Sequence, residues 1–209
     1  AALTRKTAAI LRVHRSNFDI IGFTEAPAIE DLAEMARSKG VPLVYDEGSG
    51  RVVDLEPYGF SKEPTIGELI ALGVDAVTCS TDKLIGATQG GLILGSVDII
   101  ERCRRHPLLR AVRAGKESYA VVGAALRAFA KAKHEETIPI YRMLATPLSE
   151  LRSRGESLVR GTGARLIESR AVLGGGTTPA ESMPSIAVAV AGKAAVLSER
   201  YLRLSPPIA

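Results

Sequence analysis

The feature that most constrains the fold is an alternation of short apolar runs with segments of helical periodicity. The apolar runs are rich in β-branched and aliphatic residues, and turn-forming residues separate them from the helical segments. This alternation is typical of βαβ units, in which a helical crossover joins two parallel strands. It predicts an α/β fold with a mostly parallel sheet. The strands predicted in the first part of the chain are residues 9–14, 20–23, 41–46, 75–80 and 90–95.

Two predicted helices lie between these strands, and each carries signals for its ends. One spans residues 29–39, has acidic side chains in its first turn and stops at Gly40, a residue typical of the position just after a helix. The other has Thr65 and Glu68 at the spacing of a capping box and closes on Gly73. Such crossovers bring the carboxyl ends of successive strands to one edge of the sheet.

The pattern becomes helical after the last of these strands and mixed again near the end of the chain. Three helices are predicted, followed by a strand, a loop, a strand and a final helix: residues 96–106, 117–133, 146–161, 164–169, 174–182, 184–190 and 194–204. We expect a boundary near Ile138. Residues 1–137 would then be the sheet-rich portion of a large domain, and residues 138–209 a smaller, incomplete α+β domain.

Composition excludes several classes of protein. An apolar fraction of 46% and a charged fraction of 24% are typical of a soluble globular chain rather than a disordered or fibrous one. The aromatic content of 4%, without tryptophan, argues against an aromatic platform for single-stranded nucleic acid. The net charge of +4 is compatible with RNA or phosphate ligands but does not point to either.

Cysteine usage and hydropathy give further expectations. Cys79 and Cys103 have no histidine at metal-ligand spacing, so we expect two reduced thiols in a cytoplasmic protein, without zinc or a disulfide. The most apolar stretch, residues 184–197, is short and contains Lys193, so no membrane span is predicted. The chain starts without methionine and runs directly into a predicted strand, so we expect it to be a piece of a longer protein.

Asp46 and Lys83 follow predicted strands that one helical crossover joins. Open α/β sheets bind ligands beyond the carboxyl ends of their strands, so we expect an acid and an amine to converge there. Pyridoxal phosphate requires a lysine for covalent attachment, an acid against its pyridinium nitrogen and donors for its phosphate. Ser80, Thr81 and the small residues 86–91 could supply some of these donors. The spacing alone also fits a solvated lysine and a turn-capping aspartate.

Two further groups of polar residues follow predicted elements. Arg110 and Arg113 are three residues apart, so a helix would place both guanidinium groups on one face. That face would suit a phosphate-like oxyanion, or it would form a solvated basic surface. His14, Ser16 and Asn17 follow the first predicted strand, although a lone histidine is more often structural than catalytic.

Taken together, these segments resemble the bacterial selenocysteine synthase family, the L-seryl-tRNA(Sec) selenium transferases. The resemblance covers nearly the whole chain, in the family's order and spacing. The segments that carry it are ILRVHRSNFDIIGFTE, YDEGSG, LEPYGFSKEPTIGELIALGVDAVTCSTDKLIGATQGGLILG, HPLLRAVRAGK and GGGTTPAESMPS. It implies the aspartate-aminotransferase-like fold of pyridoxal phosphate enzymes, with this chain as the lysine-bearing part of the large domain and most of the small domain.

The resemblance also implies roles for particular residues. Lys83 is implied to form the Schiff base with pyridoxal phosphate, and Asp46 to contact the pyridinium nitrogen. Asp82 is implied to be a catalytically required acid beside the lysine. Arg110 and Arg113 are implied to receive the phosphate of the selenium donor, selenophosphate.

The implied reaction replaces the hydroxyl group of serine that is esterified to tRNA(Sec). Loss of the hydroxyl leaves an aminoacrylyl intermediate, and selenium from selenophosphate adds to its β-carbon to give selenocysteinyl-tRNA(Sec). The resemblance further implies a large homo-oligomer whose active sites use neighbouring subunits. It places the domain that grips the tRNA, and the phosphate loop with its ring-stacking residue, upstream of Ala1.

Two short segments depart from the family's pattern. The family usually has Ser-Gly-Asp-Lys where this chain has STDK at residues 80–83, and Gly-Gly-Pro-Gln where it has GATQ at residues 86–89. Thr81, Ala87 and Thr88 therefore change the backbone freedom of the loop, because glycine and proline set that freedom most strongly. We expect a modest retuning of the activity rather than its loss.

Two other interpretations stay open at this point. The first is a pyridoxal phosphate lyase of the same fold that acts on a small amino acid or amino sugar acid without tRNA. Arg110 and Arg113 would also suit a phosphorylated substrate of such a lyase. The second is an inactive fragment or assembly module that contributes surface to an oligomer. A compact basic domain upstream would favour the tRNA enzyme, and its absence would favour the lyase.

Overall fold

The computed structural model describes residues 3–15, 22–23, 25–175, 177–178 and 181–204. Its contacts divide the chain into two compact units. One consists of Ala1–Ala145 with Val172–Ser182, and the other of Thr146–Ala171 with Met183–Ala209. The first unit continues past residue 137, to Ala145. These units are defined by contacts and not by independent folding, so the domain boundary near Ile138 stays a prediction.

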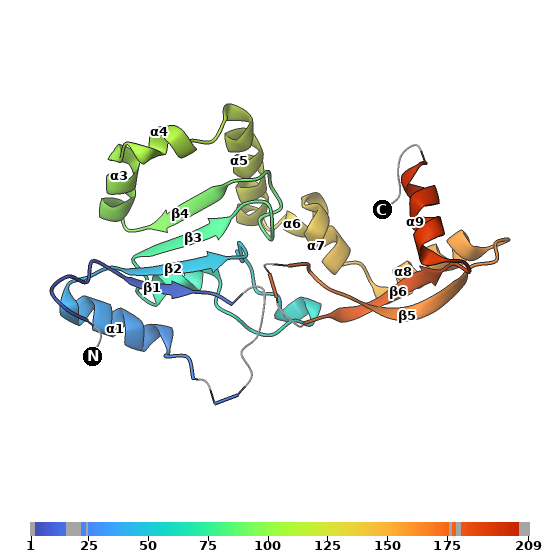
Figure 1. Cartoon of the computed structure of the whole chain (residues 1–209), viewed down its shortest axis with the longest axis horizontal. Helices are drawn as coiled ribbons and strands as arrows, with labels where there is room; N and C mark the ends of the chain where they lie inside the picture. Colours follow the sequence, from blue (N-terminus) through green and yellow to red (C-terminus); the bar gives the residue numbers. More distant parts are fainter. Residues whose placement is uncertain (1–2, 16–21, 24, 176, 179–180, 205–209) are drawn as a thin grey trace. The chain divides into compact units, whose positions relative to one another are not determined.

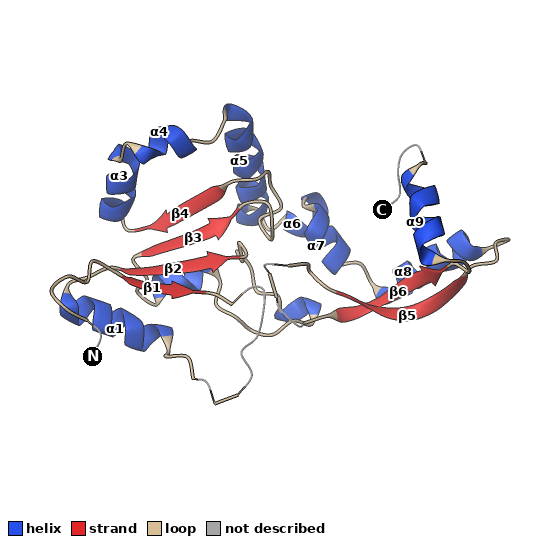
Figure 2. Ribbon diagram, in the orientation of Figure 1, coloured by secondary structure: helices blue, strands red, loops and turns tan. Residues whose placement is uncertain are grey.

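The first unit is built on a four-stranded sheet with the order β1-β2-β3-β4 (Figure 1). Its strands are β1 (Ile10–Val13), β2 (Leu43–Gly48), β3 (Ala76–Ser80) and β4 (Gly91–Gly95). β1, β2 and β3 run parallel, and β4 pairs antiparallel with β3. Figure 2 shows helices alternating with strands along this part of the chain. The predicted α/β fold with a mostly parallel sheet is confirmed.

Helical crossovers join the parallel strands, as the sequence predicts. α1 (Ile29–Lys39) precedes β2 and ends at Gly40, whose φ of 64° is a left-handed conformation that glycine adopts without strain. α2 (Ile66–Ala71) joins β2 to β3. The Thr65 hydroxyl accepts the N–H of Glu68, and the Glu68 carboxylate accepts the N–H of Thr65. The predicted capping box is therefore confirmed.

One face of the sheet is buried and the other is partly open. The buried face carries Leu43, Tyr45, Val77 and Cys79. The opposite face carries Leu11, Val13 and Ile93, which are 64%, 53% and 50% exposed. Asp46 and Thr78 lie on this open face, because the strand register pairs Val13, Asp46, Thr78 and Ile93 in one row. A flat ligand could therefore approach Asp46 from the open side.

The predicted strand at residues 20–23 falls mostly outside the described residues. Gly22 and Phe23 are described, and they form a bend rather than a strand. Within the described ranges, no helix is long and apolar enough to span a bilayer.

Several helices follow β4 in the first unit: α3 (Val97–Arg105), α4 (Leu108–Val112), α5 (Lys116–Ala130), α6 (His134–Thr137) and α7 (Pro139–Leu144). The predicted helices at residues 96–106 and 117–133 are confirmed. The short helices α6 and α7 were not predicted. They are fixed by packing, because the ring of Tyr141, which is 0% exposed, makes edge-on contacts with Phe129 and His134.

The second unit consists of a two-stranded antiparallel sheet and two helices within its described residues. α8 (Leu148–Val159) is followed by β5 (Arg165–Ala171), β6 (Met183–Ala189) and α9 (Ala194–Leu202). Gly155 is buried in α8, where a Cβ atom would lie 2.6 Å from a methyl carbon of Leu166. The glycine therefore allows the helix to approach β5 closely. The predicted helix, strand, strand and helix of this part are confirmed.

Candidate active site

Asp46 lies near the carboxyl end of β2, on the open face of the sheet, and its side chain is half-buried. The register pairs it with Thr78, whose hydroxyl donates a hydrogen bond of 2.8 Å to Asp46 Oδ1. This bond fixes the direction of the carboxylate. Among the described residues Oδ2 has no hydrogen-bond partner, so one oxygen of Asp46 is available to a ligand.

Lys83 lies in a tight turn directly after β3, which we call the Lys83 turn (residues 81–87). The N–H of Gly86 donates to the carbonyl oxygen of Lys83 at 2.9 Å, and the N–H of Ala87 donates to that of Thr81 at 2.8 Å. Thr81 is 1% exposed, and its hydroxyl donates to the carbonyl oxygen of Thr88 at 2.5 Å. The two departures from the family's pattern thus contact each other and close the turn.

The turn after β2 packs directly on the Lys83 turn. The N–H of Leu84 donates to the carbonyl oxygen of Ser49 at 2.9 Å. Gly50 has a φ of +81°, and a Cβ atom there would lie 2.8 Å from the carbonyl oxygen of Ser80 and 2.9 Å from a side-chain carbon of Ile85. The structure therefore brings the strand end that carries Asp46 together with the turn that carries Lys83.

The amine of Lys83 has no hydrogen-bond or ion-pair partner among the described residues. Its side chain is half-buried, and it forms no ion pair with a described carboxylate. The neighbouring Asp82 is exposed and likewise unpaired within the described ranges. No ion pair among the described residues has to be broken before the amine of Lys83 can react. The free amine is therefore compatible with covalent attachment of a carbonyl cofactor.

Several backbone N–H groups of the Lys83 turn already have partners within the protein. Thr81, Leu84, Gly86 and Ala87 each donate a backbone N–H to a carbonyl oxygen of the protein. Ser80 keeps a half-buried hydroxyl that has no partner in the part of the chain that the structure describes. Any contribution of this turn to binding a phosphate therefore depends on Ser80 and on the N–H groups that remain free.

Arg110 and Arg113 are exposed and lie in a different part of the first unit. Arg110 is in α4, and Arg113 is the residue that ends this helix. α4 follows α3, which begins beside the amino end of β3, where the N–H of Ser96 donates to the carbonyl oxygen of Asp75 at 2.9 Å. Figure 1 shows α4 beyond the edge strand β4. No hydrogen bond or ion pair among the described residues joins either arginine to the Lys83 turn.

Two buried charged residues that the sequence did not predict lie close to Asp46 in the chain. Glu47, in the last part of β2, is 4% exposed, and Arg51, in the turn after β2 (residues 49–51), is 1% exposed. Arg51 Nη2 lies 3.0 Å from Glu63 Oε2, and Glu63 lies 3.7 Å from His14 Nε2. The signal in the sequence was a pair of opposite charges four residues apart around two glycines.

His14 joins the same region, whereas its two predicted companions are not described. Nε2 of His14 lies 3.3 Å from the carbonyl oxygen of Thr177, which is 3% exposed. The segment around Thr177 was predicted as a loop, and it packs within the first unit. Ser16 and Asn17 lie outside the described residues.

The local charge also affects Cys79, which precedes Ser80 on the buried face. Burial, together with the negative charges of Glu47 and Asp46, raises the pKa of the Cys79 thiol to about 12. The thiol is therefore protonated at neutral pH and is a poor nucleophile. No covalent role is therefore proposed for Cys79.

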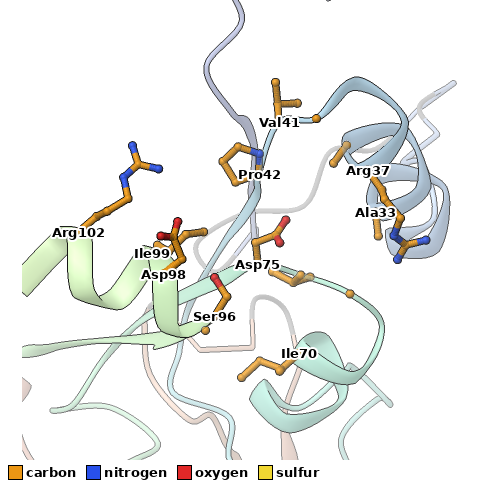
Figure 3. A pocket seen from close by; sticks show the side chains of 15 residues that line it. Ala33, Arg37, Val41, Pro42, Ile70, Asp75, Ser96, Asp98, Ile99 and Arg102 are labelled. Atoms are coloured by element: carbon orange, nitrogen blue, oxygen red, sulfur yellow. The ribbon is translucent and has the colours of Figure 1, made fainter.

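A pocket of about 670 Å³ lies at the opposite edge of the sheet (Figure 3). Figure 3 shows Asp75, at the start of β3, between Pro42 and Ser96. Oδ2 of Asp75 accepts the N–H of Leu43 at 2.8 Å, so this carboxylate serves the backbone. Neither Lys83 nor Asp46 lines this pocket. The volume of a pocket is therefore not sufficient to identify the candidate active site. Within the described ranges no three His, Cys, Asp or Glu side chains form a group that could hold a metal ion.

Solved structures identify the class of the fold. The chain is similar to D-glucosaminate-6-phosphate ammonia-lyase, with a TM-score of 0.62 and 22% identity over 97% of this chain and 48% of that one. At this identity the likeness shows the fold alone. The fold is the aspartate-aminotransferase-like α/β fold of pyridoxal-phosphate-dependent enzymes, with a lysine turn and an aspartate at the carboxyl edge of its sheet.

The sequence identifies the family within this class. The SelA family model, described as L-seryl-tRNA selenium transferase, matches residues 1–209, and the chain belongs to this family. It is 41% identical to the L-seryl-tRNA(Sec) selenium transferase of Haemophilus influenzae Rd over 99% of this chain and 48% of that protein. It is 43% identical to the same-named protein of Hyphomonas neptunium over 90% of this chain and 42% of that protein. The chain thus spans about half the length of these relatives.

Proposed function

We propose that the protein acts as an L-seryl-tRNA(Sec) selenium transferase, which converts seryl-tRNA(Sec) to selenocysteinyl-tRNA(Sec) with selenophosphate as the selenium donor. The match of the whole chain to the family carries this proposal. The contact between the turn after β2 and the Lys83 turn supports it, because the family's reaction needs an acid and an amine at one site. The activity requires the longer protein, since this chain spans about half of its relatives.

Pyridoxal phosphate is the proposed cofactor, and the residues at the carboxyl edge fit it. Lys83 offers an unpaired, half-buried amine for covalent attachment. Asp46 offers a carboxylate oxygen that Thr78 leaves free, on the open face where a planar ring can lie against it. Ser80 offers a hydroxyl to the phosphate. When bound, the cofactor supplies an electron sink for negative charge at the substrate's α-carbon.

The proton transfers are assigned to Lys83 and Asp82. With cofactor and substrate bound, the amine of Lys83 would act as the base that takes the α-proton of the serine. Asp82 is adjacent in the chain and exposed, so its carboxylate can assist proton transfer to the departing hydroxyl. Asp46 keeps a negative charge opposite the ring nitrogen and so favours the protonated ring.

Arg110 and Arg113 are assigned to the phosphate of selenophosphate. Both are exposed and form no ion pair within the described residues, so their guanidinium groups are free to bind an oxyanion. We also propose a homo-oligomer in which these arginines of one chain serve the Lys83 site of another. This arrangement would explain why α4, which carries Arg110, lies beyond β4 and not at the carboxyl edge of the sheet (Figure 1).

The remaining assignments are proposals of the same kind. Residues 1–137 are proposed as a portion of the cofactor-binding large domain, and residues 138–209 as the incomplete small domain. A location in the cytoplasm also stays a prediction. The likeness to the ammonia-lyase concerns the fold, so it adds no support to the lyase interpretation.

The direct test uses the full-length protein with pyridoxal phosphate, serine-charged tRNA(Sec) and selenophosphate. We expect selenocysteinyl-tRNA(Sec), detected by hydrolysis of the ester and mass analysis of the amino acid. Arg110→Ala with Arg113→Ala should raise the KM for selenophosphate without preventing binding of the charged tRNA. Release of ammonia from a free amino acid or amino sugar acid, with no product on tRNA, would instead establish the lyase. No turnover with either substrate would favour the assembly module.

A further inference from the structure

The turn after β2 encloses a buried carboxylate. Glu47 Oε2 accepts the N–H of Gly50 at 2.5 Å and that of Arg51 at 3.3 Å, and Oε1 accepts the hydroxyl of Ser49. Glu47 and Ser49 are 4% and 0% exposed. A buried carboxylate that accepts several hydrogen bonds holds its donors firmly, because each donor would otherwise lose a charge-assisted bond. Glu47 therefore fixes the shape of this turn.

Arg51 anchors this turn to the rest of the first unit. Its guanidinium group is fully buried, and Nη1 donates to the carbonyl oxygen of Ser61 at 3.3 Å. Nη2 lies 3.0 Å from Glu63 Oε2 but without the alignment of a hydrogen bond, so this attraction is chiefly electrostatic. A buried cation without a partner is strongly unfavourable. The ion pair with Glu63 therefore restricts where Arg51 and its turn can lie.

Tyr141 of α7 is fully buried, and its pKa responds to the charges of both Arg51 and Glu47. Burial raises the pKa of Tyr141, the charge of Arg51 opposes this rise, and the charge of Glu47 adds to it. The hydroxyl of Tyr141 has no hydrogen-bond partner among the described residues. Both charges therefore act on α7 as well as on the turn after β2.

The turn that Glu47 and Arg51 fix is the one that supports Lys83. Its residue Ser49 accepts the N–H of Leu84, and Gly50 leaves no room for a Cβ atom against Ser80 and Ile85. Leu84 and Ile85 are 1% and 0% exposed. A displacement of the turn after β2 must therefore displace the Lys83 turn as well.

We propose that Arg51 and Glu47 are positioning residues, which hold the turn after β2 so that it sets the place of Lys83 relative to Asp46. Neither residue touches the reacting groups. Arg51 connects the turn to Glu63 and Ser61 in a neighbouring segment. Glu47 accepts hydrogen bonds from residues of the turn itself. The consequence for catalysis rests on the proposed function, whereas the mechanical coupling of the two turns does not.

The coupling is tested by hydrogen–deuterium exchange of the full-length protein, followed by mass spectrometry of peptides that cover residues 81–87. Arg51→Met keeps the approximate volume and removes the charge, so we expect exchange in this peptide to become about tenfold faster. Glu47→Gln removes one charged acceptor and should act in the same direction. The matched control is Lys62→Met, since Lys62 lies in the same segment as Ser61 but is 69% exposed. It should leave the exchange unchanged.

A second measurement separates positioning from general destabilisation. A peptide that covers α3 reports on the fold away from the two turns, because α3 forms no hydrogen bond with either turn among the described residues, and its exchange should not change in Arg51→Met. Titration of the variant with pyridoxal phosphate, followed by visible absorbance, should show an affinity that is lower by about tenfold. Arg51→Lys, which keeps the charge, should recover part of both effects.

Several results would overturn the proposal. They are unchanged exchange at residues 81–87 in a folded Arg51→Met variant, or equal acceleration at α3. If Arg51→Met does not fold, Glu63→Gln decides in its place, because Glu63 is partly exposed and its loss is milder. If the wild-type protein binds no pyridoxal phosphate, the proposed function fails, and the exchange at residues 81–87 still decides whether the turns are coupled.

Discussion

Leu84 donates its backbone N–H to the carbonyl oxygen of Ser49 at 2.9 Å. This single bond joins the turn that carries Lys83 to the turn that follows Asp46, two segments separated by a helix and a strand in the sequence. Because both residues are buried, water cannot replace either partner without exposing the turns. The bond therefore makes the placement of the lysine depend on the shape of the neighbouring turn.

Gly50→Ala should destabilise the protein and displace the Lys83 turn. The new Cβ atom would lie 2.8 Å from the carbonyl oxygen of Ser80, and the φ of +81° is strained for alanine. We expect a loss of about 2 to 4 kcal/mol in the free energy of unfolding, measured with urea. The control is Gly48→Ala, where φ is +68° but nothing lies within 4 Å, so only the backbone strain of about 1 kcal/mol should appear. Equal losses in the two variants would contradict the close packing of the turns.

Thr81→Val should weaken the Lys83 turn by removing one buried hydrogen bond. The Thr81 hydroxyl donates to the carbonyl oxygen of Thr88, and valine has the same shape without this donor. We expect a loss of about 1 to 2 kcal/mol in the free energy of unfolding. Thr81→Ser keeps the hydroxyl, so its free energy of unfolding should fall less than that of Thr81→Val. If both variants were as stable as the wild type, the departures at Thr81 and Thr88 would have no structural role.

Asp46→Asn should remove most of the activity while the fold is retained. An amide keeps the volume of the side chain but loses the negative charge that favours a protonated ring nitrogen. We expect kcat to fall by at least about 100-fold, measured as selenocysteinyl-tRNA formed per site. Thr78→Val leaves the charge of Asp46 but removes the hydrogen bond to its Oδ1, so we expect kcat to fall by about tenfold. Circular dichroism should confirm that both variants are folded, and full activity of Asp46→Asn would remove Asp46 from the site.

Cys79 should make stability depend on pH in the alkaline range. Its pKa is raised from 9.0 to about 12 by burial and by Glu47 and Asp46, so the folded state favours the neutral thiol. This contribution is fully present below pH 9 and is lost as the pH rises from there toward about 12, because the unfolded chain releases the proton first. From about pH 9 upward, the free energy of unfolding should fall more steeply in the wild type than in Cys79→Ala, by at most about 1.4 kcal/mol per pH unit. Parallel curves for the two proteins would show that the thiol does not titrate in this way.

Local sequence signals predicted much of the fold. The capping box at Thr65 and Glu68 and the glycine after α1 set the ends of the crossover helices, because these signals act within a few residues. The alternation of strands and helices then predicted the parallel sheet. The short helices α6 and α7 were missed, because aromatic packing around Tyr141 from distant segments stabilises them.

The site was predicted only in the part that strand order determines. Asp46 lies near the carboxyl end of β2 and Lys83 follows the adjacent strand β3, so topology alone brings their segments together. Glu47 and Arg51 could not be assigned from the sequence, since a charged side chain is normally exposed and only the tertiary structure shows that these two are buried. The spacing of Arg110 and Arg113 placed both on one face only if their segment were helical; α4 ends at Val112, with Arg113 just after it, and the sequence did not predict where this helix lies.

We propose that Lys83 is the residue that binds pyridoxal phosphate covalently. The most direct measurement is reduction of the full-length protein with borohydride in saturating cofactor, followed by peptide mapping by mass spectrometry. We expect one phosphopyridoxyl group per chain, on the peptide that contains Lys83, and none in Lys83→Ala. Labelling that is confined to other lysines, or an unmodified Lys83 in the saturated protein, would contradict the account.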